Sequence, residues 1–172
     1  MGYLIGVSLL LIMGLCDPVK ASAMDHSNSI NQATSMQALG KHGEILTINQ
    51  SQDLKNGSLI TVTGKRFDST VGIYVAMCKV VPADSLPTPC GGGADKTGHL
   101  QASYWISSNP PAYGKGLAIP FHNSSFKVQL KVSSSIGKFD CQKISCAIYV
   151  RADHTRTDDR DYDIKIPVTF KK

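Results

Sequence analysis

Four cysteines are the residues of this chain whose type and spacing most directly imply chemistry. They form two short-range couples, Cys78 with Cys90 and Cys141 with Cys146. Such thiols either form disulfides or bind zinc as thiolates. Neither spacing is the C-x2-C common in zinc sites, so we expect neither a metal nor another cofactor. Three disulfide pairings are formally possible, and neighbour pairing is favoured because each couple would then tie the end of its own strand.

A second set of reactive side chains is the charged segment 151–163. Asp159, Asp161 and Asp163 have the alternate spacing of calcium ligands, but the glycine and the distal glutamate of a calcium loop are absent. The segment interleaves three arginines with five aspartates, which favours a network of Arg–Asp pairs that stiffens the loop. Calcium binding stays open as the alternative.

A histidine beside an aspartate, as at Asp153-His154, can suggest acid–base catalysis. No nucleophile elbow, phosphate-binding loop or partner motif accompanies this pair. We therefore expect His154 to be a surface or hydrogen-bonded histidine. We also predict that the protein is not an enzyme and has no catalytic residues.

The only tryptophan, Trp105, lies in the segment 103–116, which also holds tyrosines, prolines and glycines. Aromatic side chains on a stiff loop give a rigid contact surface, as in the binding loops of β-sandwiches. The alternative is that Trp105 and Ile106 pack onto the domain as a lid. We favour the lid because tryptophan is highly buried on average.

The first 23 residues predict export. An apolar run at 3–15 precedes Ala21-Ser22-Ala23, which has the form of a signal-peptide cleavage site. The run is shorter than the roughly 20 apolar residues of a membrane-spanning helix, so no transmembrane segment is expected in the mature chain. Cleavage after Ala23 would remove Cys16 and leave four cysteines, which is typical of a secreted protein. Acylation of Cys16 is the alternative, but Leu15 stands where a small residue is normally required.

The rest of the 172-residue chain suits a single folded domain. Residues 24–42 are rich in Ser, Asn, Gln and Ala and predict a flexible spacer, whereas residues 43–172 predict the domain itself. The net charge is +5, but Lys and Arg are scattered and are not gathered into a run. We therefore expect a monomer with no specific nucleic-acid partner.

Short strands separated by turns dominate the chain from residue 43 onward. Apolar and polar residues alternate strictly in 126–133 and 162–171, which predicts strands with one face in a core. Further strands are indicated by apolar runs at 45–48, 58–63, 71–80 and 147–151. Pro167 indicates that the last strand has a free edge. These features predict an all-β, immunoglobulin-like two-sheet sandwich of about seven strands.

Four segments carry a resemblance to a known family. They are 57–64 with Phe67, 74–78, 138–147 and 166–170. In this order they resemble the neocarzinostatin family of secreted actinobacterial proteins, across residues 43–170. The resemblance implies a seven-stranded immunoglobulin-like sandwich with both disulfides at matching places. It also implies an open cleft beside one sheet, in which the best-known members carry an enediyne chromophore.

The chain departs from that family in two places. An insertion at about 97–123 stands where the compact carriers run directly into the next strand. The positions that line the family's cleft are small or polar, and here they are Ala147, Tyr149 and Arg151. Because Tyr149 and Arg151 would fill or reshape the cleft floor, we expect weak or no binding of an enediyne.

Strand alternation predicts which side chains face a ligand. Within 146–151 the even-numbered residues should point into the core, so Ala147, Tyr149 and Arg151 should face the other way. We predict that any small-molecule site involves these three residues, with Trp105 closing over them. An aromatic ring beside a guanidinium suits a flat, electron-rich or anionic ligand.

Two functions remain in view. The first is a secreted binding module that holds a small aromatic or hydrophobic ligand in a cleft beside one sheet. The alternative is a cell-surface or envelope interaction protein that contacts a macromolecular partner through its loops. A deep cleft beside Tyr149 and Arg151 would favour the first, and a flat, filled sheet with protruding loops would favour the second.

Overall fold

The computed structural model describes residues 1–2, 35–92 and 99–172. Residues 3–23 of the predicted signal peptide and residues 24–34 of the predicted spacer 24–42 lie outside the described residues. The fold described below comprises residues 35–92 and 99–172.

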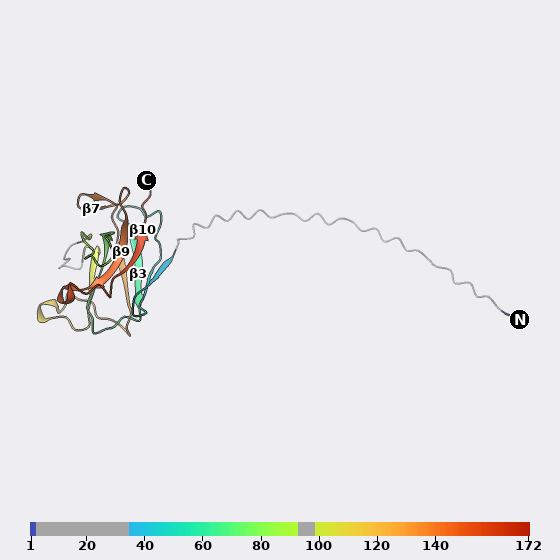
Figure 1. Cartoon of the computed structure of the whole chain (residues 1–172), viewed down its shortest axis with the longest axis horizontal. Helices are drawn as coiled ribbons and strands as arrows, with labels where there is room; N and C mark the ends of the chain where they lie inside the picture. Colours follow the sequence, from blue (N-terminus) through green and yellow to red (C-terminus); the bar gives the residue numbers. More distant parts are fainter. Residues whose placement is uncertain (3–34, 93–98) are drawn as a thin grey trace. The chain divides into compact units, whose positions relative to one another are not determined.

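The regular elements of the described chain are strands apart from two short 3₁₀ turns (Figure 1). The strands are β1 (Met36–Leu39), β2 (Ile45–Ile48), β3 (Leu59–Lys65), β4 (Ile73–Lys79), β5 (Ser103–Ile106), β6 (Phe126–Lys131), β7 (Ser135–Ile136), β8 (Phe139–Asp140), β9 (Cys146–Ala152) and β10 (Ile164–Val168). Two 3₁₀ turns, η1 (Ala112–Gly114) and η2 (His154–Arg156), complete the elements. In the part of the chain described, neither has the length or apolar character to cross a membrane.

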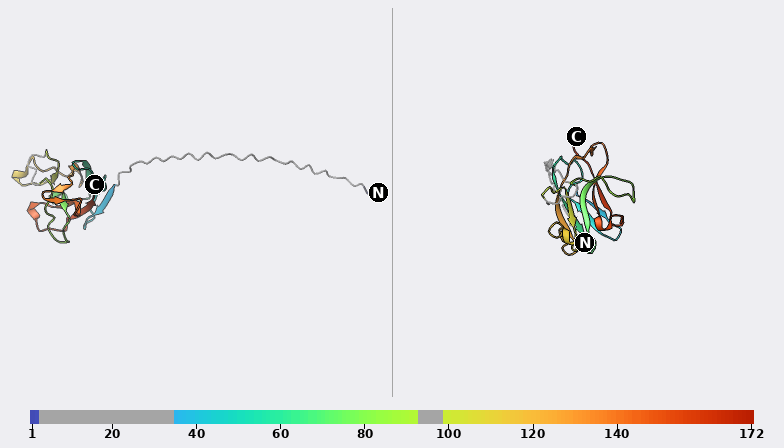
Figure 2. Two further views of the ribbon diagram at one scale, coloured as in Figure 1. Left: turned by 90° about the horizontal axis from the view of Figure 1, so that it is seen from above. Right: turned by 90° about the vertical axis from the view of Figure 1, so that its left-hand side faces the viewer.

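The strands form two antiparallel sheets, ordered β1-β2-β3-β6 and β10-β9-β4-β5, with β7 and β8 as a separate small hairpin (Figure 2). One core cluster joins the two sheets, including the fully buried Val62 and Leu130 of the first and Ile148 and Val150 of the second. The predicted immunoglobulin-like two-sheet sandwich is confirmed. Its two main sheets hold eight strands, and β10 is an edge strand, as Pro167 indicated.

Both predicted disulfides are present, Cys78–Cys90 and Cys141–Cys146. Cys141 and Cys146 belong to the main core and fasten the turn that leads into β9. Cys78 lies on the opposite face of its sheet, in a second buried cluster with Ala147 and Tyr149. The first disulfide therefore ties a loop to the outer face of the second sheet.

Besides the small hairpin β7–β8, two strands of the main sheets lie where the sequence predicted none. β1 falls inside the predicted spacer, where its residues pair with β2 and alternate between half-buried and exposed. Only Met36 and Ala38 of this edge strand pack against the core. Because so few of its residues need to be apolar, the strand has the polar composition that predicted a spacer. β5 falls inside the insertion and forms the other edge of the second sheet. Ile106 is fully buried in the core, whereas Trp105 faces outward beside Tyr74.

Candidate ligand-binding site

Strand pairing sets the order of side chains on the outer face of the β10-β9-β4-β5 sheet. Directly opposed residues in antiparallel strands point to the same side. Tyr74 on β4 is paired with Arg151 on β9 and with Trp105 on β5. Two residues further along β4, Ala76 is paired with Tyr149. The predicted outward direction of Tyr149 and Arg151 agrees with this pairing.

The loop between β4 and Cys90 covers the middle of this face. Ala147 is 0% exposed and Tyr149 is 3% exposed, although both point away from the main core. The loop is held to its strand by the Cys78–Cys90 disulfide and by a backbone hydrogen bond from the Gly91 N–H to the Met77 carbonyl. Loop residues 81–85 lie on the side of Tyr149, and residues 86–91 lie on the side of Ala76.

The larger of the two pockets that border this loop has a volume of about 490 Å³. It is lined by Tyr74, Ala76, Leu86, Pro87, Thr88, Pro89, Cys90, Gly91, Ser103, Arg151 and His154. The loop supplies apolar walls of proline, leucine and disulfide, and the strands supply the aromatic and charged groups. This is the composition expected of a pocket for a small organic molecule.

Arg151 is the charged group of this pocket. Its guanidinium carbon lies 5.1 Å from the centre of the Tyr74 ring, within the range of a cation–π interaction. The arginine ion pairs of the described residues involve Arg156 and Arg160 and leave Arg151 without a carboxylate. Burial, followed by the nearby charge of Arg160, lowers the pKa of Arg151. Arg151 therefore presents a half-buried positive charge that forms no ion pair with a carboxylate of residues 35–92 or 99–172.

His154 lies between two tyrosine hydroxyls. Its Nδ1 atom is hydrogen-bonded to the Tyr74 hydroxyl, and its Nε2 atom lies 2.6 Å from the Tyr113 hydroxyl. Burial, and then the charge of Asp153, raise the pKa of Tyr74. His154 is thus the hydrogen-bonded histidine that the sequence favours, and the two tyrosines fix its ring at the pocket wall.

Trp105 is fixed from the other side. Its indole N–H donates a 2.8 Å hydrogen bond to the buried carboxylate of Asp153, and its ring lies 5.0 Å from that of His154. Trp105 therefore contacts the Tyr74–His154 end of the sheet and does not close over Tyr149. The four residues predicted for one site are divided: Arg151 lines the larger pocket, Tyr149 lines the smaller one, and Trp105 and Ala147 line neither.

Tyr74 and His154 line the larger pocket although they were not predicted to do so, and Tyr113 contacts His154. Tyr74 had a detectable signal, because it alternates with the core residues Ile73 and Val75 and must point outward. Tyr113 gave no such signal. It belongs to the turn η1, and only the fold brings it to His154.

The Arg/Asp loop forms the predicted ion pairs. Arg156 pairs with Asp159 at 2.7 Å and Arg160 with Asp163 at 2.9 Å. Asp161 pairs instead with Lys41. The three aspartates with calcium-like spacing therefore each face a different basic group. Within residues 35–92 and 99–172, no group of three or more His, Cys, Asp or Glu side chains is arranged to hold a metal ion.

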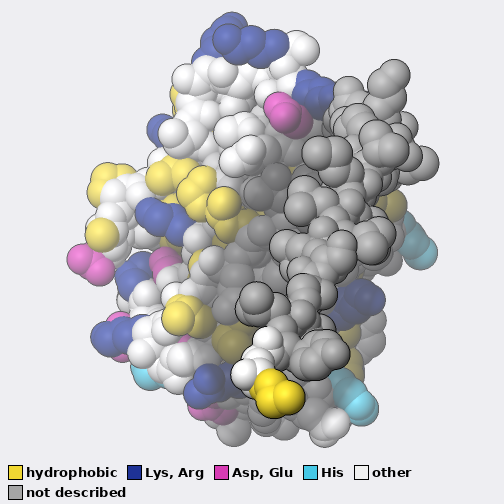
Figure 3. Space-filling model, turned by 90° about the vertical axis from the view of Figure 1, so that its right-hand side faces the viewer, with side chains coloured by type: hydrophobic (Ala, Val, Ile, Leu, Met, Phe, Trp, Pro, Cys, Tyr) yellow, Lys and Arg dark blue, Asp and Glu magenta, His cyan; other side chains and the backbone are white. Residues whose placement is uncertain are grey.

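Basic side chains are spread over the surface. On the described part of the face in Figure 3, Lys and Arg occupy separate places with polar and apolar atoms between them. Along the sequence, Lys and Arg likewise form no run longer than the pairs Lys65-Arg66 and Lys171-Lys172. Arg151 is the one Lys or Arg among the described residues that line the larger pocket.

No family model matches the sequence, and no curated protein is similar enough to match it. Among solved structures the chain is similar to macromomycin, a protein of the neocarzinostatin family. The sequence identity is 17%, the TM-score is 0.48, and the alignment covers 75% of this chain and 100% of macromomycin. At this identity the likeness concerns the fold alone. In the order of its motifs, the positions of its disulfides and its sandwich architecture, the chain resembles the neocarzinostatin family.

Proposed function

We propose that the protein is an exported, non-catalytic binding module that holds a small, flat aromatic molecule carrying an anionic group in the larger pocket. The observation that carries this proposal is Arg151. Its guanidinium is half-buried, lies over the Tyr74 ring and has no carboxylate partner among the described residues. A buried charge is costly unless it is paired, so an anionic ligand group would complete this site.

The size and walls of the pocket support the same ligand class. A volume of about 490 Å³ falls within the roughly 300–1,000 Å³ of typical small-molecule sites. Pro87, Pro89 and the Cys78–Cys90 disulfide offer rigid apolar contacts to an aromatic ligand. His154 adds a polar group that Tyr74 and Tyr113 already orient.

The ligand is not expected to be an enediyne. The positions that correspond to the family's cleft floor include Ala147 and Tyr149, and both are buried beneath the loop that ends at Cys90. The remaining pocket lies to one side of that loop and is bordered by Arg151. Export is supported by the two disulfides, which persist in oxidising compartments.

The proposal is tested by titration with 8-anilinonaphthalene-1-sulfonate, a flat aromatic anion. Trp105 is the only tryptophan and contacts Tyr74, so energy transfer from Trp105 to the probe reports binding at this end of the sheet. Arg151→Ala should weaken binding at least about tenfold, the effect of losing one charged hydrogen bond, and Arg151→Lys should weaken it less. Lys127→Ala removes the same charge from an exposed position on the other sheet and should change nothing.

The neutral analogue N-phenyl-1-naphthylamine distinguishes the contribution of the anionic group to binding from that of the aromatic rings. It should bind the native protein and Arg151→Ala about equally, because it has no anionic group for the guanidinium. Equal affinity of the sulfonate for native protein and Arg151→Ala would contradict the proposal. Absence of binding by both probes would favour the macromolecular interaction protein instead.

A further inference from the structure

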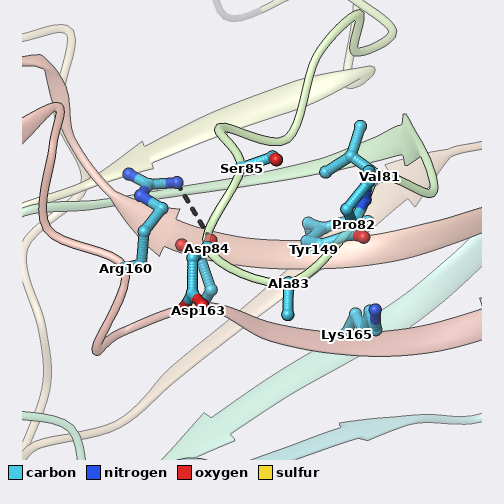
Figure 4. Close-up of a pocket in the computed structure, with 9 residues that line it drawn as sticks. All are labelled: Val81, Pro82, Ala83, Asp84, Ser85, Tyr149, Arg160, Asp163 and Lys165. Atoms are coloured by element: carbon cyan, nitrogen blue, oxygen red, sulfur yellow. Dashed lines mark hydrogen bonds and ion pairs between the residues drawn. The ribbon is translucent and has the colours of Figure 1, made fainter.

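We infer that the smaller pocket is a second, independent ligand site, built for a small neutral molecule rich in hydroxyl groups, such as a single sugar unit or a cyclic polyol. The pocket has a volume of about 220 Å³ and lies between β9, β10 and the loop segment 81–85 (Figure 4). Tyr149, Arg160, Asp163 and Lys165 supply its polar groups from the strands and the turn before β10. This inference does not depend on the function proposed for the larger pocket.

Three residues that line this pocket each carry a buried polar atom without a hydrogen-bond partner in the described protein. These atoms are the Tyr149 hydroxyl, Arg160 Nε and Asp163 Oδ1, which are the buried side-chain atoms left unsatisfied among the described residues. Tyr149 is 3% exposed, and the Arg160 and Asp163 side chains are 12% and 19% exposed. Buried polar groups are nearly always paired, so three such atoms around one hollow indicate a missing hydrogen-bonding partner.

The unsatisfied atoms define the chemistry of that partner. Arg160 already donates to Asp163 Oδ2 at 2.9 Å and to the Thr157 carbonyl at 2.6 Å, which leaves its Nε–H as a free donor. Asp163 Oδ1 is a free acceptor, and the Tyr149 hydroxyl can do either. A ligand hydroxyl both donates and accepts, so neighbouring hydroxyls on one small molecule satisfy the whole set.

The charge balance favours a neutral ligand. The pocket holds two basic groups, Arg160 and Lys165, and two acidic groups, Asp84 and Asp163, and the Arg160–Asp163 pair is already neutralised internally. A zwitterionic amino acid would have to compete with that ion pair for both of its charges. A polyol leaves the pair intact, and its C–H face can pack on Pro82 and the Tyr149 ring.

The volume limits the ligand to a small one. About 220 Å³ is below the roughly 300–1,000 Å³ of pockets for drug-sized molecules. The loop that ends at Cys90 also separates this hollow from the larger pocket, since residues 81–85 border one and residues 86–91 border the other. The two sites should therefore fill independently.

The test is an amide ¹H–¹⁵N NMR titration of the full mature protein. The probes are myo-inositol, glucose, galactose and N-acetylglucosamine, with glycine and alanine as the zwitterionic comparison. At least one polyol should shift the amides of 83–85 and 163–165, and Tyr149→Phe should weaken its binding about three- to tenfold. Tyr113→Phe removes a hydroxyl beside the larger pocket and serves as the matched control. Saturation with the anilinonaphthalene probe should leave the polyol affinity unchanged.

Three results would overturn the inference. One is the absence of pocket shifts with every polyol up to near its solubility limit. Another is stronger binding of the amino acids than of any polyol. The third is an increased melting temperature of Tyr149→Phe with unchanged polyol shifts, since the hydroxyl would then be only an unsatisfied group in the fold. Failure of the sulfonate probe at the larger pocket would leave these results unaffected.

Discussion

Trp105 donates its indole N–H to the carboxylate of Asp153 across 2.8 Å, and this bond fastens the edge strand β5 to the turn that follows β9. The other oxygen of Asp153 accepts from the backbone N–H and the hydroxyl of Thr155. Asp153 is 2% exposed, and a Cβ atom at Gly72 would collide with it. One buried carboxylate thus bonds Trp105 to the 153–155 turn and packs against Gly72.

Loss of this carboxylate should destabilise the domain. Asp153→Ala leaves the Trp105 and Thr155 donors without their acceptor, so we expect the free energy of unfolding to fall by at least about 2 kcal/mol. Asp158→Ala, at an exposed position of the same loop, should change it by no more than about 0.5 kcal/mol. Urea denaturation followed by Trp105 emission measures both. Equal free energies of unfolding for Asp153→Ala and Asp158→Ala would show that the Trp105–Asp153 hydrogen bond does not stabilise the domain.

The pKa of Asp163 predicts a pH-dependent stability. Burial raises it from the ordinary 3.8 to about 6, against the opposing effects of Arg160 and Arg151. The folded protein therefore holds this proton more tightly than the unfolded chain. The resulting stabilisation is full below pH 3.8 and is lost as the pH rises through about 6.

Carboxyl ¹³C NMR should accordingly show an Asp163 titration midpoint near pH 6. Asp163→Asn should unfold less readily than the native protein at pH 7.5, and this advantage should shrink at pH 4.5. Asp161 is the control, because its hydrogen bond with Lys41 lowers its pKa. An Asp163 midpoint below that of Asp161 would refute the prediction.

The insertion should contribute to the core. Ile106 is fully buried in the core cluster, so Ile106→Ala should lower the free energy of unfolding by about 2–5 kcal/mol. Leu117, in the same insertion, is 45% exposed, and Leu117→Ala should cost about 0.5 kcal/mol or less. Thermal and urea denaturation compare the two variants. A small effect at both positions would mean that the insertion is only an appended loop.

The two disulfides should contribute similarly to the stability of the domain, but only one of them should affect ligand binding. Each closes a short loop, so replacing either pair with serine should cost about 2–3 kcal/mol by the chain-entropy argument. Because Cys90 lines the larger pocket, loss of Cys78–Cys90 should also weaken binding of the sulfonate probe. Loss of Cys141–Cys146 should leave that affinity unchanged in the folded protein. Titration of both serine variants with the sulfonate probe measures this difference. Non-reducing peptide mapping of the native chain checks the pairing.

Export remains a prediction of the sequence. Cleavage after Ala23 should give a mature chain that begins at Met24, because the apolar run 3–15 is followed by Ala21-Ser22-Ala23. Mass spectrometry of the culture supernatant measures the N-terminus. Recovery of the protein only as a species acylated on Cys16 would show a lipoprotein instead.

The sequence by itself predicted most of the strands and their inward and outward faces, and it favoured the disulfide pairing that the structure has. Each of these depends on local features: period-two alternation, as in β6 and β10, and cysteines at neighbouring strand ends. β1 and β5 were missed because each has only four residues and lacks the regular buried–exposed alternation of the other two edge strands, β6 and β10: β1 has no fully buried residue, and in β5 only Ile106 is buried. The outward direction of Tyr149 and Arg151 could also be predicted, since it follows from the buried direction of Ile148 and Val150.

Only the tertiary structure decided what covers those outward side chains. The loop that ends at Cys90 lies over Tyr149 and leaves Arg151 in a separate pocket, so two residues expected in one site belong to two. In the same way, only folding brings Tyr113 to His154. Alternation along a strand gives the direction of a side chain, because direction is a property of the local backbone. What the side chain meets there depends on segments far away in sequence, and their positions are set by the packing of the whole domain.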